Sequence, residues 1–305
     1  MTPTIDTTSF LQRDYTNCLR GIAAVIIVVF HVLITWDCPR VVNLPGSVAV
    51  ALFLFLSGFG IHESYKKNGL KGFWGKKLKR IVLPYLLFIT IVTLVRGNFN
   101  IRTYLLDVCF IDSSYWFVAY LMRCYLLYWI IQHFFPSRLL WLYALGGVIA
   151  LNVFQQIEAE QSFSFFMGIC ASRHIGQLRT AEGRWFLKAA VVCSFLGLFF
   201  LLLKEIPPIH AYKGTLPYNY ILLLIKMPLA VPIMLLPLVL PRLTHSRFWQ
   251  LCGISSLELY LVHMTVVDHV EMTAASVALY VLFIAVVTCL FYQVNRLIQR
   301  IPLPF

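Results

Sequence analysis

Apolar segments that alternate with short polar ones run along the whole chain and most constrain its fold. We distinguish ten: 20–36, 46–63, 80–96, 115–134, 139–156, 162–173, 185–203, 218–240, 247–267 and 274–295. A helix of about 20 apolar residues crosses the roughly 30 Å hydrocarbon core of a bilayer. The chain is 60% hydrophobic and only 12% charged, against about 25% charged in soluble domains. We therefore expect an all-α integral membrane protein, with about ten transmembrane helices in one bundle.

The distribution of lysine and arginine predicts the orientation. With the N-terminus inside, 18 of these residues fall in cytoplasmic segments and five on the other side, which is the bias of membrane proteins. Both termini are then cytoplasmic, with an N-terminal segment (1–19), a membrane domain (20–295) and a tail (296–305). Because the net charge of +12 lies in short loops, we expect no nucleic-acid partner. The eight cysteines form no C-x-x-C pair, so we expect no zinc or other metal site.

Two ionisable residues share the first apolar segment. Arg20 and His31 are eleven positions apart, which is about three turns and about 16 Å along a helix, so both lie on one face. With Arg20 at a membrane surface, His31 lies near the midplane, where an ionisable group is a candidate for function. A histidine hydrogen-bonded between helices is the competing interpretation. A neutral imidazole can accept a proton, and Arg20 suits a phosphate or carboxylate.

The basic loop KKNGLKGFWGKKLKRIVLP (66–84) offers a second candidate site. Lys77 and Arg80, three residues apart, share a helix face. They can bind the phosphates of a nucleotide-like donor. Topology anchoring alone also explains a loop of this kind.

Further polar residues lie inside apolar segments. Ser57, Gly58 and Gly60 are typical of close helix packing, and we favour that interpretation over a serine nucleophile. Glu258 lies near Tyr260 and His263. We expect Glu258 to pair with Lys226 or Arg123, which are also embedded.

Six segments, in order, together resemble the membrane-bound acyltransferase-3 family. They are NCLRGIAAVIIVVFH (17–31) with its Arg-x10-His motif, FLFLSGFGI (53–61), KKLKRIVLPYLL (76–87), YWFVAYLMRCYLL (115–127), SFFMGICAS (164–172) and ISSLELYLVHM (254–264). Members move acyl groups, commonly acetyl, from a cytoplasmic thioester to extracytoplasmic carbohydrates or lipids. The resemblance implies His31 as the essential residue, with Arg20 supporting it and Lys77 and Arg80 near the donor. Members often carry an acid where this chain has Asn17.

These observations predict an O-acyltransferase of the bacterial cytoplasmic membrane. The donor is acyl-CoA, expected to be acetyl-CoA, and the acceptor is a hydroxyl of an extracytoplasmic glycan or glycolipid. Arg20, Lys77 and Arg80 bind the donor, and His31 accepts the proton of the acceptor. Larger members carry an appended hydrolase-like domain that completes transfer outside the membrane. We expect this chain to act alone or with a separate extracytoplasmic protein, and its other expected partners are membrane lipids. The residues expected to support the site are Asn17, Ser57, Trp116, Arg123, Lys226, Glu258, Tyr260 and His263.

Two functions other than catalysis stay open. A transporter or lipid or oligosaccharide flippase would line its path with Arg123, Lys226 and Glu258, and would show paired repeats. A non-catalytic subunit of an envelope assembly complex would not need His31.

Overall fold

The computed structural model describes residues 6–36, 44–97, 100–111, 113, 115–153 and 156–301. Within these residues the fold is helical throughout and no strand is found. Arg40, one of the five lysines and arginines counted on the outer side, lies outside the described residues. The elements are α1 (Arg13–Thr35), α2 (Leu44–Asn68), α3 (Phe73–Lys77), η2 (Leu78–Val82), α4 (Leu83–Arg96), α5 (Ile101–Val108), α6 (Trp116–Phe134), η3 (Pro136–Arg138), α7 (Leu139–Val153), α8 (Gln156–Ala159), α9 (Ser164–Arg173), α10 (Ile175–Thr180), α11 (Gly183–Glu205), α12 (Pro207–His210), α13 (Leu216–Val239), α14 (Arg242–His245), α15 (Arg247–Ile254), α16 (Ser256–Val266), η4 (Val267–His269) and α17 (Ala274–Arg300).

The all-helical membrane class is confirmed, whereas the count of about ten spans is not. Seven of the described helices are long and apolar enough to cross a bilayer. The bent pair of α15 with the segment 256–269 makes eight if it counts as one span. The other two expected spans fail for different reasons. Helix α6 has 19 residues, but polar side chains such as Arg123 and Gln132 lower its mean hydropathy. Helix α9 has only ten residues.

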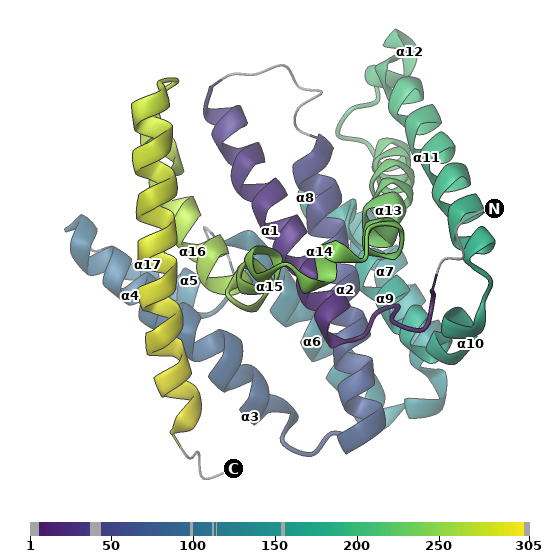
Figure 1. The fold of residues 1–305 in the computed structure, drawn as a ribbon, viewed down its shortest axis with the longest axis horizontal. Coiled ribbons are helices and arrows are strands. Elements are labelled where there is room, and N and C mark those ends of the chain that lie inside the picture. Colours follow the sequence, from purple (N-terminus) through teal and green to yellow (C-terminus); the bar gives the residue numbers. More distant parts are fainter. Residues whose placement is uncertain are drawn as a thin grey trace.

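Helices α1 and α2 form the centre of the bundle. In Figure 1, α13 and then α11 lie to one side of them, and α16 and α17 to the other. The C-terminal end of α1, α12 and the start of α17 lie at one end of the molecule. Helix α3 and the C-terminal end of α17 lie at the opposite end (Figure 1). We call these the His31 end and the Lys77 end, after the functional candidates nearest to each.

Glycines bring the central helices into backbone contact. A Cβ atom on Gly58 of α2 would lie 2.0 Å from the carbonyl oxygen of Phe165, and one on Gly168 of α9 would lie 2.0 Å from that of Phe55. Helices α1 and α15 meet in the same way, at Gly21 and Gly253. Small residues allow such approaches between membrane helices. The first crossing holds α9 against α2, and the second holds α15 against α1, which carries Arg20 and His31.

Candidate functional site

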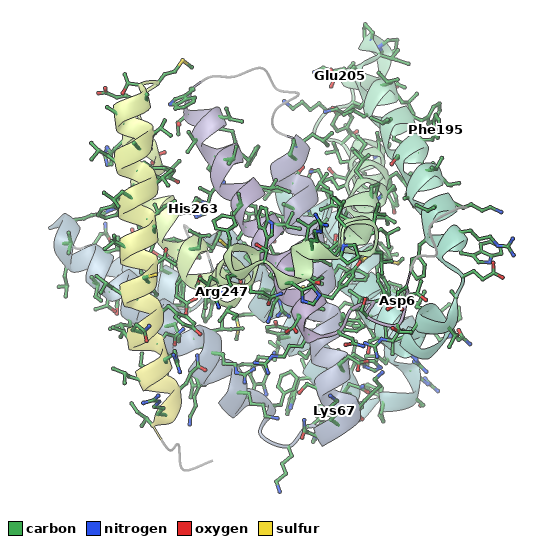
Figure 2. The ribbon with its side chains drawn as sticks, viewed as in Figure 1. Asp6, Lys67, Phe195, Glu205, Arg247 and His263 are labelled. Atoms are coloured by element: carbon green, nitrogen blue, oxygen red, sulfur yellow. The ribbon has the colours of Figure 1, made fainter. Side chains whose placement is uncertain are left out.

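A cavity of about 1160 Å³ extends between the two ends of the bundle. Its lining includes Lys71 and Gln299 from the Lys77 end and His210 and Lys213 from the His31 end. Figure 2 shows the side chains of the described residues, with His263 labelled between the two ends. Arg20 and His31 both line this cavity, so one face of α1 borders it along about 16 Å of helix.

His31 is hydrogen-bonded to a second histidine. Its Nδ1 lies 3.0 Å from Nε2 of His263 on α16, and the ring centroids are 5.1 Å apart. Nδ1 of His263 lies 2.9 Å from the carbonyl oxygen of Leu259. His263 is fully buried, whereas His31 is partly exposed and lines the cavity.

The hydrogen bond to Leu259 determines the protons of both rings. A carbonyl only accepts, so Nδ1 of His263 carries a hydrogen. A neutral His263 then accepts at Nε2, and His31 donates to it from Nδ1. In that tautomer a neutral His31 has its lone pair on Nε2. His31 can therefore accept a proton at Nε2 while His263 stabilises the resulting imidazolium.

The pair depends on a bend in the chain. Helices α15 and α16 meet at Ser255 at an angle of 77°, which lets α15 cross α1 at Gly21 while α16 reaches His31. At the end of α1, Nε1 of Trp36 donates to the carbonyl oxygen of Val270 over 2.9 Å. Contacts on both sides of the bend thus fix α16 against α1.

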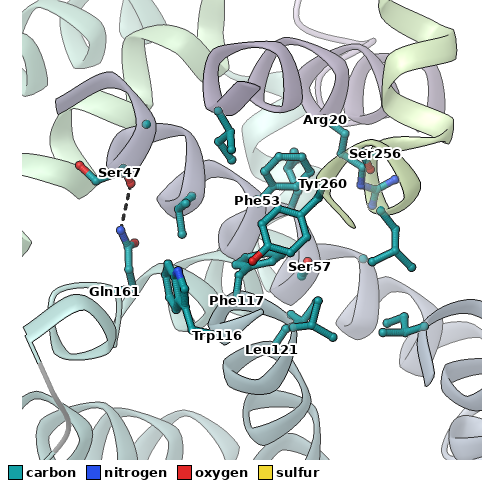
Figure 3. Close-up of a pocket in the computed structure, with 18 of the residues that line it drawn as sticks. Arg20, Ser47, Phe53, Ser57, Trp116, Phe117, Leu121, Gln161, Ser256 and Tyr260 are labelled. Atoms are coloured by element: carbon teal, nitrogen blue, oxygen red, sulfur yellow. Dashed lines mark hydrogen bonds between the residues drawn. The ribbon is translucent and has the colours of Figure 1, made fainter. Parts of the chain in front are cut away.

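An aromatic cluster of Phe53, Phe117 and Tyr260 lies in the cavity beside the histidines. The rings of Phe117 and Tyr260 are 5.5 Å apart, and those of Tyr260 and His263 are 5.7 Å apart. Figure 3 shows this cluster between Arg20 on one side and Trp116 on the other. The Tyr260 hydroxyl is buried and has no hydrogen-bond partner among the described residues. A buried orphan donor of this kind suits a ligand.

Cations without acidic partners gather at the Lys77 end. Arg20 donates from Nη1 to Oδ1 of Asn17 over 3.3 Å, so an amide occupies the place next to the guanidinium. Gly60 leaves room there, since a Cβ atom on it would lie 3.6 Å from Nη2 of Arg20. No salt bridge of the described residues involves Arg20, Lys77 or Arg80.

Lys77 and Arg80 lie next to each other on the cavity wall. Nζ of Lys77 is 3.9 Å from the ring centroid of Tyr125, a cation–π contact. Arg80 belongs to η2, a single π-helical turn. Pro84 follows it and has no N–H to donate to the carbonyl of Arg80, which favours a widened turn. Arg13, Lys71, Lys76 and Arg296 also line this end. A cluster of cations that forms no salt bridge with the described residues can bind an anion.

Six of the eight supporting candidates also line the cavity: Asn17, Ser57, Trp116, Lys226, Glu258 and Tyr260. Ser57 lies on α2 between Arg20 and the aromatic cluster (Figure 3). At Gln161, near Trp116, Nε2 donates to the carbonyl oxygen of Ser47 over 2.9 Å. His263 reaches the cavity through His31.

The predicted pairing of Glu258 with Lys226 or Arg123 is wrong. Glu258 accepts a hydrogen bond of 2.6 Å from Nδ2 of Asn295 on α17. Lys226 forms a buried salt bridge with Glu160, and Arg123 lies 2.7 Å from Glu158. Both carboxylates belong to the segment before α9. Through these two ion pairs, that segment links α6, which carries Arg123, to α13, which carries Lys226. Glu258 and Lys226 line the cavity, whereas Arg123 does not.

Sequence reasoning missed two members of the site. Tyr125, under Lys77, carries no signal that separates it from the other tyrosines of α6. Asn295 is one of several polar residues in the last turns of α17 and stands at the end of the last predicted apolar segment. His263 was noted, but nothing in its spacing linked it to His31, which is 232 positions away.

One comparison with known proteins gave a match. A family model described as "Acyltransferase domain" matches residues 13–294. Curated proteins and solved structures gave no match.

Proposed function

The chain belongs to the acyltransferase-3 family, and from this premise we propose that it transfers an acyl group from acyl-CoA to an acceptor hydroxyl across a membrane. The observation that carries the proposal is the cavity, which has an unpaired cation cluster at one end and a histidine oriented as a base at the other. The positive-inside bias puts the Lys77 end in the cytoplasm, where acyl-CoA is made. The membrane is the bacterial cytoplasmic membrane.

Arg20, Lys77 and Arg80 bind the phosphates of the donor. Their guanidinium and ammonium groups form charge-assisted hydrogen bonds with phosphate oxygens. The pantetheine arm of CoA is a linear chain, and along α1 it extends past Ser57 toward His31. The thioester carbonyl then lies beside the aromatic cluster, where the Tyr260 hydroxyl can donate to it.

The acceptor enters from the His31 end, and His31 acts as the general base. Nε2 of His31 takes the proton of the acceptor hydroxyl as its oxygen attacks the thioester carbonyl. The tetrahedral oxyanion accepts from the Tyr260 hydroxyl. The C–S bond then breaks, and the proton on His31 passes to the CoA sulfur. The products are an acyl ester and CoA thiol, and His31 returns to its starting state.

Two measurements on the full-length protein test this function. In lipid nanodiscs containing an envelope lipid extract, the protein should release CoA thiol from acetyl-CoA. Cells with the protein should contain envelope glycans or lipids heavier by one acyl group than cells without it, by mass spectrometry. A His31→Ala protein that folds and still produces the acylated species contradicts the mechanism. Transport of envelope lipid without consumption of acetyl-CoA contradicts the function and favours a flippase.

A further inference from the structure

The cavity also reaches the lateral surface of the bundle, near the His31 end. Leu202 of α11 and Ile157 of α8 both line it, and both are exposed apolar side chains, Leu202 by 71% and Ile157 by 45%. Helix α11 lies at the edge of the bundle beyond α13 (Figure 1), and only 6% of its most apolar stretch is buried. Such a helix faces lipid, so a cavity bordered by its exposed leucine opens sideways to the membrane. We call Ile157, Leu201 and Leu202 the side opening.

The rim of the side opening is basic. Lys204 and Lys213 line the cavity next to it. Lys204 is partly neutralised by Glu205, at 3.2 Å. No salt bridge of the described residues involves Lys213, which is exposed. His210, also in the lining, has a buried Nδ1 without a described partner. Lysines at the end of a membrane helix lie at the level of the lipid headgroups, where they attract anionic ones.

From this arrangement, and resting on the function proposed above, we propose that the acceptor is lipid-linked through a phosphate and enters by the side opening. Its hydrocarbon chain lies along Leu202 and Ile157, outside the bundle. Its phosphate binds Lys213, with Lys204 beside it. The part of the headgroup beyond the phosphate extends into the cavity toward His31 and carries the hydroxyl that is acylated. The apolar wall and the adjacent cation together select an amphipathic anion, which neither a soluble glycan nor a neutral lipid provides.

Photo-crosslinking at the side opening tests this proposal. The full chain carries p-benzoylphenylalanine in place of Leu202, in phosphatidylcholine nanodiscs that contain farnesyl phosphate as the probe. Phe195 is the matched control position. It lies seven residues earlier on the same face of α11, is 73% exposed and does not line the cavity. Mass spectrometry measures the ratio of farnesyl phosphate to phosphatidylcholine adducts at each position.

We expect this ratio to be about five-fold higher at Leu202 than at Phe195, the effect of about 1 kcal/mol for one lysine at a membrane surface. Lys213→Gln should remove the enrichment and Lys213→Arg should retain it. Equal ratios at the two positions overturn the proposal. Enrichment of farnesol to the same extent overturns the phosphate contact, and full displacement by an equal concentration of inorganic phosphate overturns the lipid anchor. A His31→Ala protein should label normally, so this result is independent of acyl transfer.

Discussion

His31 and His263 form a pair in which each ring limits the protons of the other. The carbonyl of Leu259 holds the hydrogen on Nδ1 of His263, and the contact between the rings then leaves the lone pair of His31 on Nε2. His263 is fully buried and does not line the cavity. In the proposed mechanism His263 is therefore a positioning residue that acts through His31, and His31, which lines the cavity, is the residue that meets the substrates.

Replacing His263 should slow turnover without weakening donor binding. In a His263→Ala protein His31 remains but nothing fixes its tautomer or stabilises its imidazolium, so we expect kcat to fall about 10- to 100-fold, which is less than the roughly 10²- to 10⁴-fold that a general base itself contributes. The KM for acetyl-CoA should change little, and the pH dependence of kcat should shift. Steady-state kinetics across pH measure both effects.

His62 provides the matched control for this experiment. It is another buried histidine on a central helix, but it contacts Tyr128 at 2.8 Å and does not line the cavity. A folded His62→Gln protein should keep its pH profile. An unchanged profile in the His263 variant would instead make that residue a packing element.

The cations at the Lys77 end should act on donor affinity. A charged hydrogen bond contributes about 1.5–3 kcal/mol, so Lys77→Gln or Arg80→Gln should raise the KM for acetyl-CoA about 10- to 100-fold. S-acetylpantetheine has the same thioester but no phosphate, and its KM should not respond. Lys79→Gln is the control, since Lys79 donates to the carbonyl of Ile301 outside the cavity. An equal effect of Lys77→Gln on both donors would exclude a phosphate contact.

At the scale of helices, glycines decide which elements pack and which face the cavity. Gly58 and Gly60 are two positions apart on α2 and have different surroundings. Gly58 contacts the backbone of α9, whereas Gly60 faces the guanidinium of Arg20. The sequence motif predicts close packing for both, and the structure assigns it to Gly58.

Alanine substitutions should separate these two roles. Gly58→Ala places a Cβ atom 2.0 Å from a backbone oxygen, so α2 and α9 must move apart. Overpacking of this kind costs about 1–3 kcal/mol. We expect a clearly lower thermal unfolding midpoint in detergent. Gly60→Ala meets only the end of a flexible side chain at 3.6 Å and should unfold near the parent temperature. Equal midpoints would contradict the assignment of the helix contact to Gly58.

How much of the structure is predictable from sequence depends on whether the property is local. Apolar length and helical spacing are local, and they place Arg20 and His31 on one face of one helix. The structure then shows that this face borders the cavity. The partner of a buried charge is not local. Lys226 pairs with Glu160, which lies in a polar segment that periodicity assigns to a loop. The place of α9 in the bundle is also not local. Its ten residues are too few to cross a membrane, and it is the backbone contact at Gly168 that packs them against α2.

At the scale of the whole molecule, the cavity connects two chemically different ends. The Lys77 end is rich in cations that form no salt bridge with the described residues, and the His31 end combines the proposed base with the proposed side opening toward lipid. Acyl transfer through such a path requires only the pantetheine arm to cross the middle. The nucleotide part of the donor and the acceptor then never need to pass each other.

Blocking the middle of the cavity should therefore stop transfer and leave donor binding intact. Ser57 lines the cavity on α2, between Arg20 and the aromatic cluster. A Ser57→Trp protein fills this path with an indole, so acetyl-CoA turnover should fall below detection. Calorimetry should still measure the binding of 3′,5′-ADP, the phosphate-bearing end of CoA without the arm. Its affinity should stay within about three-fold of the parent value, a change in binding free energy of under about 1 kcal/mol.

Ser57→Ala is the control and should retain turnover, since the path stays open. Loss of turnover in Ser57→Ala would make the hydroxyl a participant in the reaction, and full turnover in Ser57→Trp would show that the acyl group reaches the acceptor by another path.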